Sequence, residues 1–292
     1  MRAVDQHISS ALKQYAQQLE THFKCDVLAY VGVIHPAALT NYREVLETTK
    51  KAVGKPAGHD PQKLVIVLTT GGGVVETVEK MVDLTRHHYS DVSFVVPDMA
   101  MSAGTVWCMS GDRIWMDYAS SLGPVDPQVP SAHGSLVPAL GYLDKVQEFV
   151  DKAKANALSA AEAILLQRVD LAELRRYEQA RDLSISLLKQ WLVAYKFKNW
   201  THHKTTSPGT PVTQQQKEQR AEQIAKDLAD NKRWHSHSRM ISMACLQKDL
   251  RVEIDDYSAV PALRDNVKIY AALLQEHLDR QGSHYFVHSA WG

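Results

Sequence analysis

Residues 63–79 read KLVIVLTTGGGVVETVE and residues 92–109 read VSFVVPDMAMSAGTVWCM, and these two stretches decide the fold. Each begins with a short run rich in β-branched residues, continues through glycine or other small residues, and ends in helical spacing of apolar residues. Short apolar strands that alternate with helices are typical of a parallel sheet that is covered on both faces. We therefore expect an α/β fold.

The same alternation extends outward from these two stretches. Strands are expected at 26–34, 63–68, 92–96 and 113–116, and helices at 5–23, 38–53, 75–88 and about 102–109. After residue 143 helical periodicity dominates, and Ser159–Glu162 has the pattern of a capping box. Further helices are expected at 214–230 and 263–280, with a loop or hinge at 205–213. We divide the chain into a core (1–146), a helical insertion (147–230), and a return segment with the C-terminal helix (231–292).

The overall composition excludes several classes of protein. The 292 residues carry 33 basic and 33 acidic side chains, so a nucleic-acid protein with a basic face is not expected. The three cysteines, Cys25, Cys108 and Cys245, form no CxxC pair and are expected to be reduced. No apolar run reaches the length of a membrane span, and the N-terminus lacks a signal-peptide core. We expect a cytoplasmic protein without an integral membrane segment.

The glycine triplet 71–73 lies between a strand and a helix. Consecutive glycines there can expose N–H groups that hold an anion or a developing oxyanion, or they can simply form a tight turn. The third glycine of the dinucleotide fingerprint is replaced by Glu76, and no Gly-Lys-Ser/Thr follows the triplet. No cofactor is therefore expected.

Ser102 lies where the next strand passes into a helix, among small residues. A serine at that position is either the N-cap of the helix or a nucleophile favoured by the helix dipole. In a parallel sheet Ser102 and the glycine triplet lie at the same carboxyl edge, where active sites form. The G-x-S-x-G pattern of α/β-hydrolases is absent.

The sequence resembles the serine dehydrogenase proteinase family of the Clp/crotonase superfamily, which is similar to signal peptide peptidase A and the Clp protease. Residues 69–84 (TTGGGVVETVEKMVDL) and 96–128 (VPDMAMSAGTVWCMSGDRIWMDYASSLGPVDPQ) carry the resemblance, which covers about residues 26–130. It returns at 234–254 (WHSHSRMISMACLQKDLRVEI), where Ser238 replaces a family glycine. The stretch between about 147 and 230 resembles no family that we identify.

This resemblance implies a spiral of stacked β-β-α units and serine peptidase chemistry. It implies Ser102 as the nucleophile and the amides of Gly72 and Ala103 as oxyanion donors, which would supply several kcal/mol of transition-state stabilisation. We also expect Gly71, Gly73 and Asp126 to contact substrate. Asp126 could alternatively position a base or cap the turn in which it lies.

The sequence offers more than one candidate for the general base. Clp proteases have a histidine soon after the serine, but LGPVDPQ contains none, and His133 lies farther on in a loop. Serine–lysine relatives have a lysine on a covering helix, and Lys145 lies 43 residues after Ser102, near that spacing. Burial would make its amine available, although a solvated lysine beside Asp144 is the alternative. We favour Lys145 as the base.

His237 is the competing candidate, because the resemblance places its segment beside the active site. It could act as base, as orienting group or as a structural hydrogen-bond donor, with Arg239 in an internal ion pair. The histidine pairs at 87–88, 202–203 and 235/237 are accompanied by no HExxH motif or Cys/His quartet, so no metal site is expected.

We therefore expect a serine peptidase that cleaves peptide or protein substrates through an acyl-enzyme on Ser102. A crotonase-like enzyme for acyl-thioesters and an inactive scaffold of the same fold are the alternatives. The amphipathic helix at 5–23 and the apolar residues 285–287 offer more apolar surface than a monomer needs, so we also expect a homo-oligomer.

Overall fold

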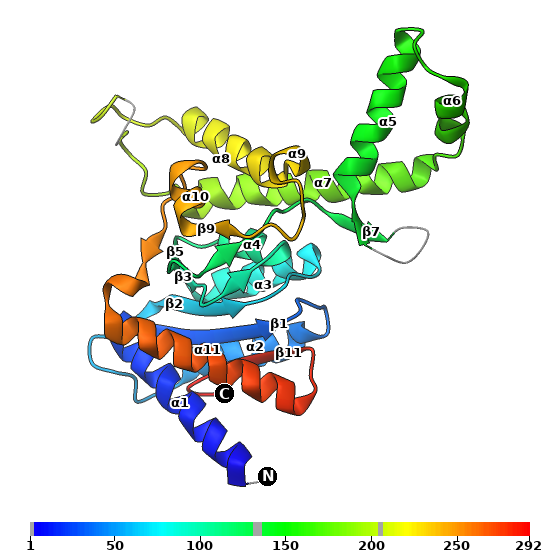
Figure 1. The fold of residues 1–292 in the computed structure, drawn as a ribbon. Helices are drawn as coiled ribbons and strands as arrows, with labels where there is room; N and C mark the ends of the chain where they lie inside the picture. Colours follow the sequence, from blue (N-terminus) through cyan, green and yellow to red (C-terminus); the bar gives the residue numbers. More distant parts are fainter. Residues whose placement is uncertain (1–2, 131–135, 204–206) are drawn as a thin grey trace.

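The centre of the protein is a six-stranded sheet with the strand order β10-β5-β3-β2-β1-β11 (Figure 1). The computed structural model describes residues 3–130, 136–203 and 207–292. The strands are β1 (Cys25–Gly32), β2 (Asp60–Thr69), β3 (Asp91–Val95), β5 (Arg113–Met116), β10 (Asp255–Asp256) and β11 (Tyr285–Ser289). All neighbours are parallel except β11, which pairs antiparallel with β1. The expected mainly parallel α/β sheet is confirmed.

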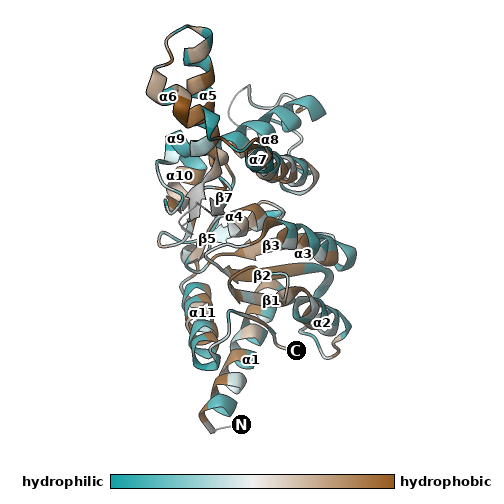
Figure 2. Cartoon of the chain, turned by 90° about the vertical axis from the view of Figure 1, so that its right-hand side faces the viewer, coloured by the Kyte–Doolittle hydropathy of each residue, from teal (hydrophilic) through white to brown (hydrophobic). Residues whose placement is uncertain are grey.

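Helices cover both faces of this sheet. Successive residues of a strand point to opposite sides, so each strand contributes side chains to both helical layers. Leu28 and Tyr30 pack with α2 (Ala38–Lys51), α3 (Val75–His88) and α4 (Ala103–Cys108). Val27 and Ala29, from the same strand, pack with α1 (Ala3–Phe23) and α11 (Pro261–Gln281). Figure 2 shows the resulting apolar strands between helices whose outer faces are hydrophilic. Burial on both faces explains why these strands read as continuous apolar runs.

The helices between residues 139 and 248 form the upper part of Figure 1, in which α5 and α6 project as an arm. Their bounds are α5 (Ala139–Lys154), α6 (Ala160–Gln167), α7 (Leu171–Trp191), a π-helical turn (Leu192–Lys196), α8 (Gln214–Ala229), α9 (Asn231–Trp234) and α10 (Met243–Lys248). The expected capping box at Ser159 is confirmed and begins α6. Leu188 of α7 and Ile224 of α8 are fully buried in the same core as the sheet. The boundary that we expected at 146/147 falls inside α5.

A second, three-stranded sheet joins distant parts of the sequence. It consists of β4 (Met99–Ala100), β6 (Ser121–Leu122) and β9 (Ile241–Ser242). A further pair, β7 (Gln128–Pro130) and β8 (Leu136–Pro138), leads into α5. Because β6 pairs with both β4 and β9, the return segment belongs to the same small sheet as the strand that precedes Ser102.

The two apolar surfaces that suggested a homo-oligomer are covered within the chain. Leu12 and Leu19 of α1 are buried in the core that α11 shares, and Val287 is buried in β11, which extends the main sheet. That reasoning was therefore wrong, and the homo-oligomer stays a prediction without this support. In the described part of the chain, no helix combines the length and apolarity needed to cross a bilayer.

Candidate active site

Ser102 lies in a strained turn between β4 and α4. Its backbone angles are φ 51° and ψ −115°, a conformation that non-glycine residues rarely adopt and that is often found at functional sites. The turn is held by Gly104 N–H, which donates to Met101 O at 2.8 Å, and by Met101 N–H, which donates to Thr70 O at 3.0 Å. Ser102 occupies the N-cap position of α4, as one alternative expected, but its half-buried side chain makes no capping hydrogen bond to the helix.

Gly72 lies directly against this turn. A Cβ on Gly72 would be 3.0 Å from both Met101 O and Ser102 Cβ, and its φ of +108° also favours glycine. Its N–H donates to Thr70 Oγ1 at 3.0 Å, so this expected oxyanion donor is engaged by a side chain. Ala103 is the first residue of α4, and its N–H therefore has no partner within the helix.

The flanking glycines differ from each other. Gly73 has a φ of +150°, and a Cβ there would be 2.0 Å from Ile34 O, so the position needs glycine for a close backbone crossing. Gly71 is exposed, and a Cβ there would meet no atom within 4 Å. Gly73 is exposed as well, so both flanking glycines are accessible to a substrate.

The small sheet brings three separate segments to one edge. β4 and β6 are parallel, and β9 is antiparallel to β6, with Ser121 opposite Ser242 and Leu122 opposite Ile241. The C-terminal ends of β4 and β6 and the N-terminal end of β9 therefore lie at the same end of this small sheet. Ser102 follows β4, Asp126 follows β6, and His237 precedes β9, so all three lie off the same edge of this sheet.

His237 and Asp126 are in direct contact. His237 Nδ1 is 2.9 Å from Asp126 Oδ1, and the Asp126 side chain is only 2% exposed. Gln128 Nε2 donates to the other carboxylate oxygen at 3.2 Å. An ionised carboxylate only accepts hydrogen bonds, so beside it Nδ1 is the donor, and in a neutral imidazole Nε2 is then the acceptor. Asp126 thus holds the imidazole of His237, as one of the alternatives expected, and among the described residues no backbone N–H caps the turn through this side chain.

Lys145 pairs with a neighbour on its own helix and is largely in contact with water. It lies on α5 with its side chain 57% exposed, and its Nζ pairs with Glu148 Oε2 at 2.9 Å. The ammonium also lies 5.2 Å from the centre of the Phe149 ring. The expected desolvation of this lysine is therefore wrong here. Arg239 is likewise exposed rather than in an internal ion pair.

Several residues that shape the site were not identified from the sequence. Thr105 Oγ1 donates to Ala100 O at 2.7 Å and accepts from Gly123 N–H at 2.9 Å, which ties the serine turn to the segment leading to Asp126. A Cβ on Gly104 would be 2.4 Å from Thr70 Cγ2, and one on Gly123 would be 2.6 Å from Met101 Cε. The only sequence signal was the clustering of small residues in MSAGT and SLGP.

No group of three or more histidine, cysteine, aspartate or glutamate side chains among the described residues is arranged to hold a metal ion. His133, the loop histidine considered as a base, lies outside the described residues.

A family model for ClpP-like SDH-type serine proteinases matches residues 42–210, more than half of the chain. This chain belongs to that family. The match contains the glycine turn, Ser102 and Asp126, and it confirms the resemblance found in the sequence. It also continues through residues 147–210, which the sequence comparison had left unassigned.

The curated proteins to which the chain is similar match only short parts of it. The uncharacterized protein MJ0137 of Methanocaldococcus jannaschii is 33% identical over 98 residues, which are 33% of this chain and 32% of that protein. The uncharacterized protein MJ1495 of the same organism is 31% identical over 64 residues, 22% of each chain. This chain therefore spans a third or less of the length of these curated relatives.

Two solved structures are similar in outline. A variant of the 1510-N membrane-bound stomatin-specific protease has a TM-score of 0.47 at 12% identity, covering 83% of both chains. ClpP1 from Listeria monocytogenes has a TM-score of 0.43 at 12% identity, covering 84% of this chain and 98% of that one.

Proposed function

We propose that this protein is a serine peptidase in which Ser102 is the nucleophile and His237, oriented by Asp126, is the general base. The observation that carries the proposal is the convergence of these three residues at one edge of the small sheet, with His237 and Asp126 already 2.9 Å apart. Family membership supports serine proteinase chemistry, and the strained backbone at Ser102 supports its role as nucleophile.

The reaction follows from these positions. His237 Nε2 accepts the proton of Ser102 Oγ while Oγ forms a bond to the carbonyl carbon of a peptide. The protonated imidazole, stabilised by the carboxylate of Asp126, then gives that proton to the leaving amine as the C–N bond breaks. Water hydrolyses the resulting ester by the same proton transfers in reverse order. The substrate class is a peptide or protein, and no cofactor takes part in these steps.

The developing oxyanion needs N–H donors beside Ser102. Ala103 N–H is the donor that the start of α4 supplies, and the helix dipole adds to its effect. Gly72 N–H lies on the other side of the same turn but is bonded to Thr70 Oγ1. Gly72 can become the second donor only if its amide leaves that hydroxyl when substrate binds.

Lys145 is the rival base, and two observations count against it. Its ion pair with Glu148 is on the surface of α5, and more than half of its side chain is exposed to water. A lysine that acts as a general base must lose its proton, which requires burial or a neighbouring cation. We therefore place the general base at His237.

A fluorophosphonate probe tests the nucleophile directly. We expect the probe to label the wild-type protein, and mass spectrometry of the digested adduct should locate the label on Ser102. Ser102→Ala should abolish labelling, whereas Ser90→Ala, which changes an exposed serine elsewhere, should retain it. Labelling that persists in Ser102→Ala would overturn the proposal.

A further inference from the structure

The C-terminal turn of α8 holds both segments that carry the His237–Asp126 pair. The last carbonyls of any helix lack partners within the helix and need donors from outside. Leu228 O accepts from Val125 N–H at 3.0 Å, and Val125 immediately precedes Asp126. Asp227 O accepts from Trp234 Nε1–H at 2.7 Å, and Trp234 is three residues before His237. Two consecutive carbonyls therefore connect the two halves of the pair.

The segment between Trp234 and His237 is short and well defined. Asp230 caps α9 by accepting from Lys232 N–H at 2.9 Å, and Trp234 N–H donates to Asp230 O at 3.2 Å. The chain then reverses at His235, which has a left-handed φ of 62°. The Trp234 side chain is 95% buried, since its exposed fraction is 5%. A shift of this indole would therefore move the reversal and the imidazole that follows it.

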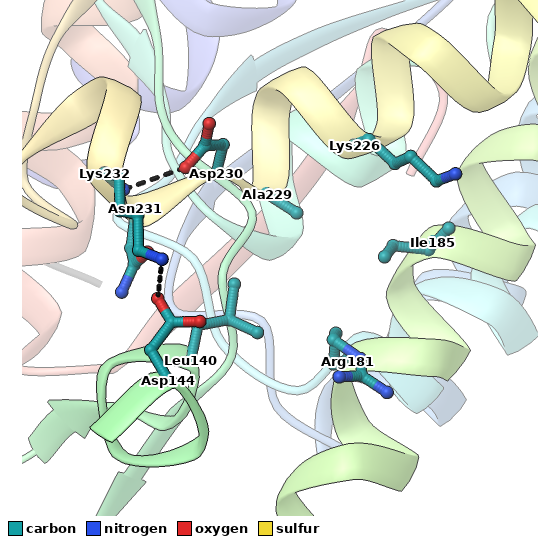
Figure 3. A pocket seen from close by; sticks show the side chains of 9 residues that line it. All are labelled: Leu140, Asp144, Arg181, Ile185, Lys226, Ala229, Asp230, Asn231 and Lys232. Carbon is teal, nitrogen blue, oxygen red and sulfur yellow. Dashed lines mark hydrogen bonds and ion pairs between the residues drawn. The ribbon is translucent and has the colours of Figure 1, made fainter. Parts of the chain in front are cut away.

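Other contacts at this junction are weaker. Lys232 Nζ pairs with Asp144 Oδ2 of α5 at 3.1 Å, but both side chains are largely exposed. Figure 3 shows this pair at the edge of a pocket of about 180 Å³ between α5, α7 and the α8–α9 junction. Arg233 Nη1 of α9 also pairs with Asp227 Oδ1 of α8 at 3.3 Å, and these side chains are only 32% and 21% exposed, so an ion pair adds to the bonds that hold α9 to the end of α8.

We infer that Trp234 is a positioning residue for the proposed catalytic pair, and that α8 sets the geometry of the pair through Asp227 O and Leu228 O. The inference rests on the proposed function. It gives the helical part of the chain a role in catalysis although none of its side chains needs to touch the substrate. Asp126 and His237 are 111 positions apart in the sequence, and α8 is the element that both segments contact by these hydrogen bonds.

The test replaces one hydrogen-bond donor and keeps the aromatic ring. Trp234→Phe removes the Nε1–H donor at α8, and Trp291→Phe is the matched control because its Nε1–H bonds Glu20 Oε1 at 2.8 Å on the far side of the sheet. We expect Trp234→Phe to lower kcat for peptide hydrolysis about tenfold with KM unchanged, and Trp291→Phe to stay within about twofold. Equal kcat in both variants would overturn the inference.

A spectroscopic measurement separates this inference from the proposed function. Long-range 1H–15N NMR reports which imidazole nitrogen carries the proton, and His237→Ala assigns the signal. In the wild-type protein and Trp291→Phe we expect His237 protonated on Nδ1, and in Trp234→Phe a mixture of the two tautomers. An unchanged tautomer in a folded Trp234→Phe overturns the positioning role even if the enzyme is active. A protein that is never labelled on Ser102 overturns the proposed function but leaves the tautomer comparison valid.

Discussion

The substitution Gly73→Ala should strongly lower the free energy of unfolding, because Gly73 lies against the backbone of Ile34. The new Cβ would lie 2.0 Å from Ile34 O and 2.8 Å from Ile34 C, so the backbones must separate. Separation breaks two hydrogen bonds of 2.9 Å, Ile34 N–H to Gly72 O and Val74 N–H to Ile34 O. Each bond contributes about 1 kcal/mol, and the strained φ of +150° adds about 1–3 kcal/mol.

The expected loss in the free energy of unfolding is therefore about 3 kcal/mol or more, a large part of the stability of an ordinary domain. Urea denaturation followed by circular dichroism measures it. Gly71→Ala is the matched control, because its Cβ would meet nothing within 4 Å, and it should change stability by less than about 1 kcal/mol. A Gly73→Ala variant as stable as Gly71→Ala would refute the proposed backbone crossing beside Ser102.

Two further predictions concern the orienting carboxylate and a buried histidine. Asp126→Asn should slow acylation of Ser102 by roughly 10²–10⁴-fold without unfolding the protein, because an amide no longer favours the Nδ1–H tautomer of His237; a loss below tenfold in stopped-flow acylation would contradict it. Burial lowers the pKa of His288 to about 4, and its Nδ1 lies 2.8 Å from Tyr270 Oη. The unfolded chain takes up this proton near pH 6.5, so stability should fall between pH 6.5 and 4 by at most about 3 kcal/mol. His288→Gln should flatten that part of the urea stability profile, and an unchanged slope would argue against the buried neutral imidazole.

The main sheet was predictable because its strands carry strong local patterns. β5 was expected at 113–116 and is found there, and α3 was expected at 75–88 and is found there. In contrast, β4, β6 and β9 have two residues each, which is too short for any periodicity. β11 was overlooked for a different reason: its apolar residues were interpreted as a surface, although they complete the sheet beside β1.

The candidate site was predictable only in part. Ser102 and the glycine turn were identified because strand, small residues and helix follow one another locally. The pairing of His237 with Asp126 spans 111 positions and depends on β9 adding to β6, which no local pattern encodes. Lys145 illustrates the opposite error. Its spacing from Ser102 suited a base, but spacing does not determine the direction in which α5 turns its side chain.

The most direct test of the catalytic assignment compares the two candidate bases in one measurement. The rate of acylation by an activated peptide ester is measured under single-turnover conditions for the wild-type protein, His237→Ala and Lys145→Ala. We predict that His237→Ala loses roughly 10²-fold or more of the rate, as expected for removal of a general base, while Lys145→Ala stays within about threefold of the wild-type protein. A dead Lys145→Ala variant beside an active His237→Ala variant would contradict the assignment of His237.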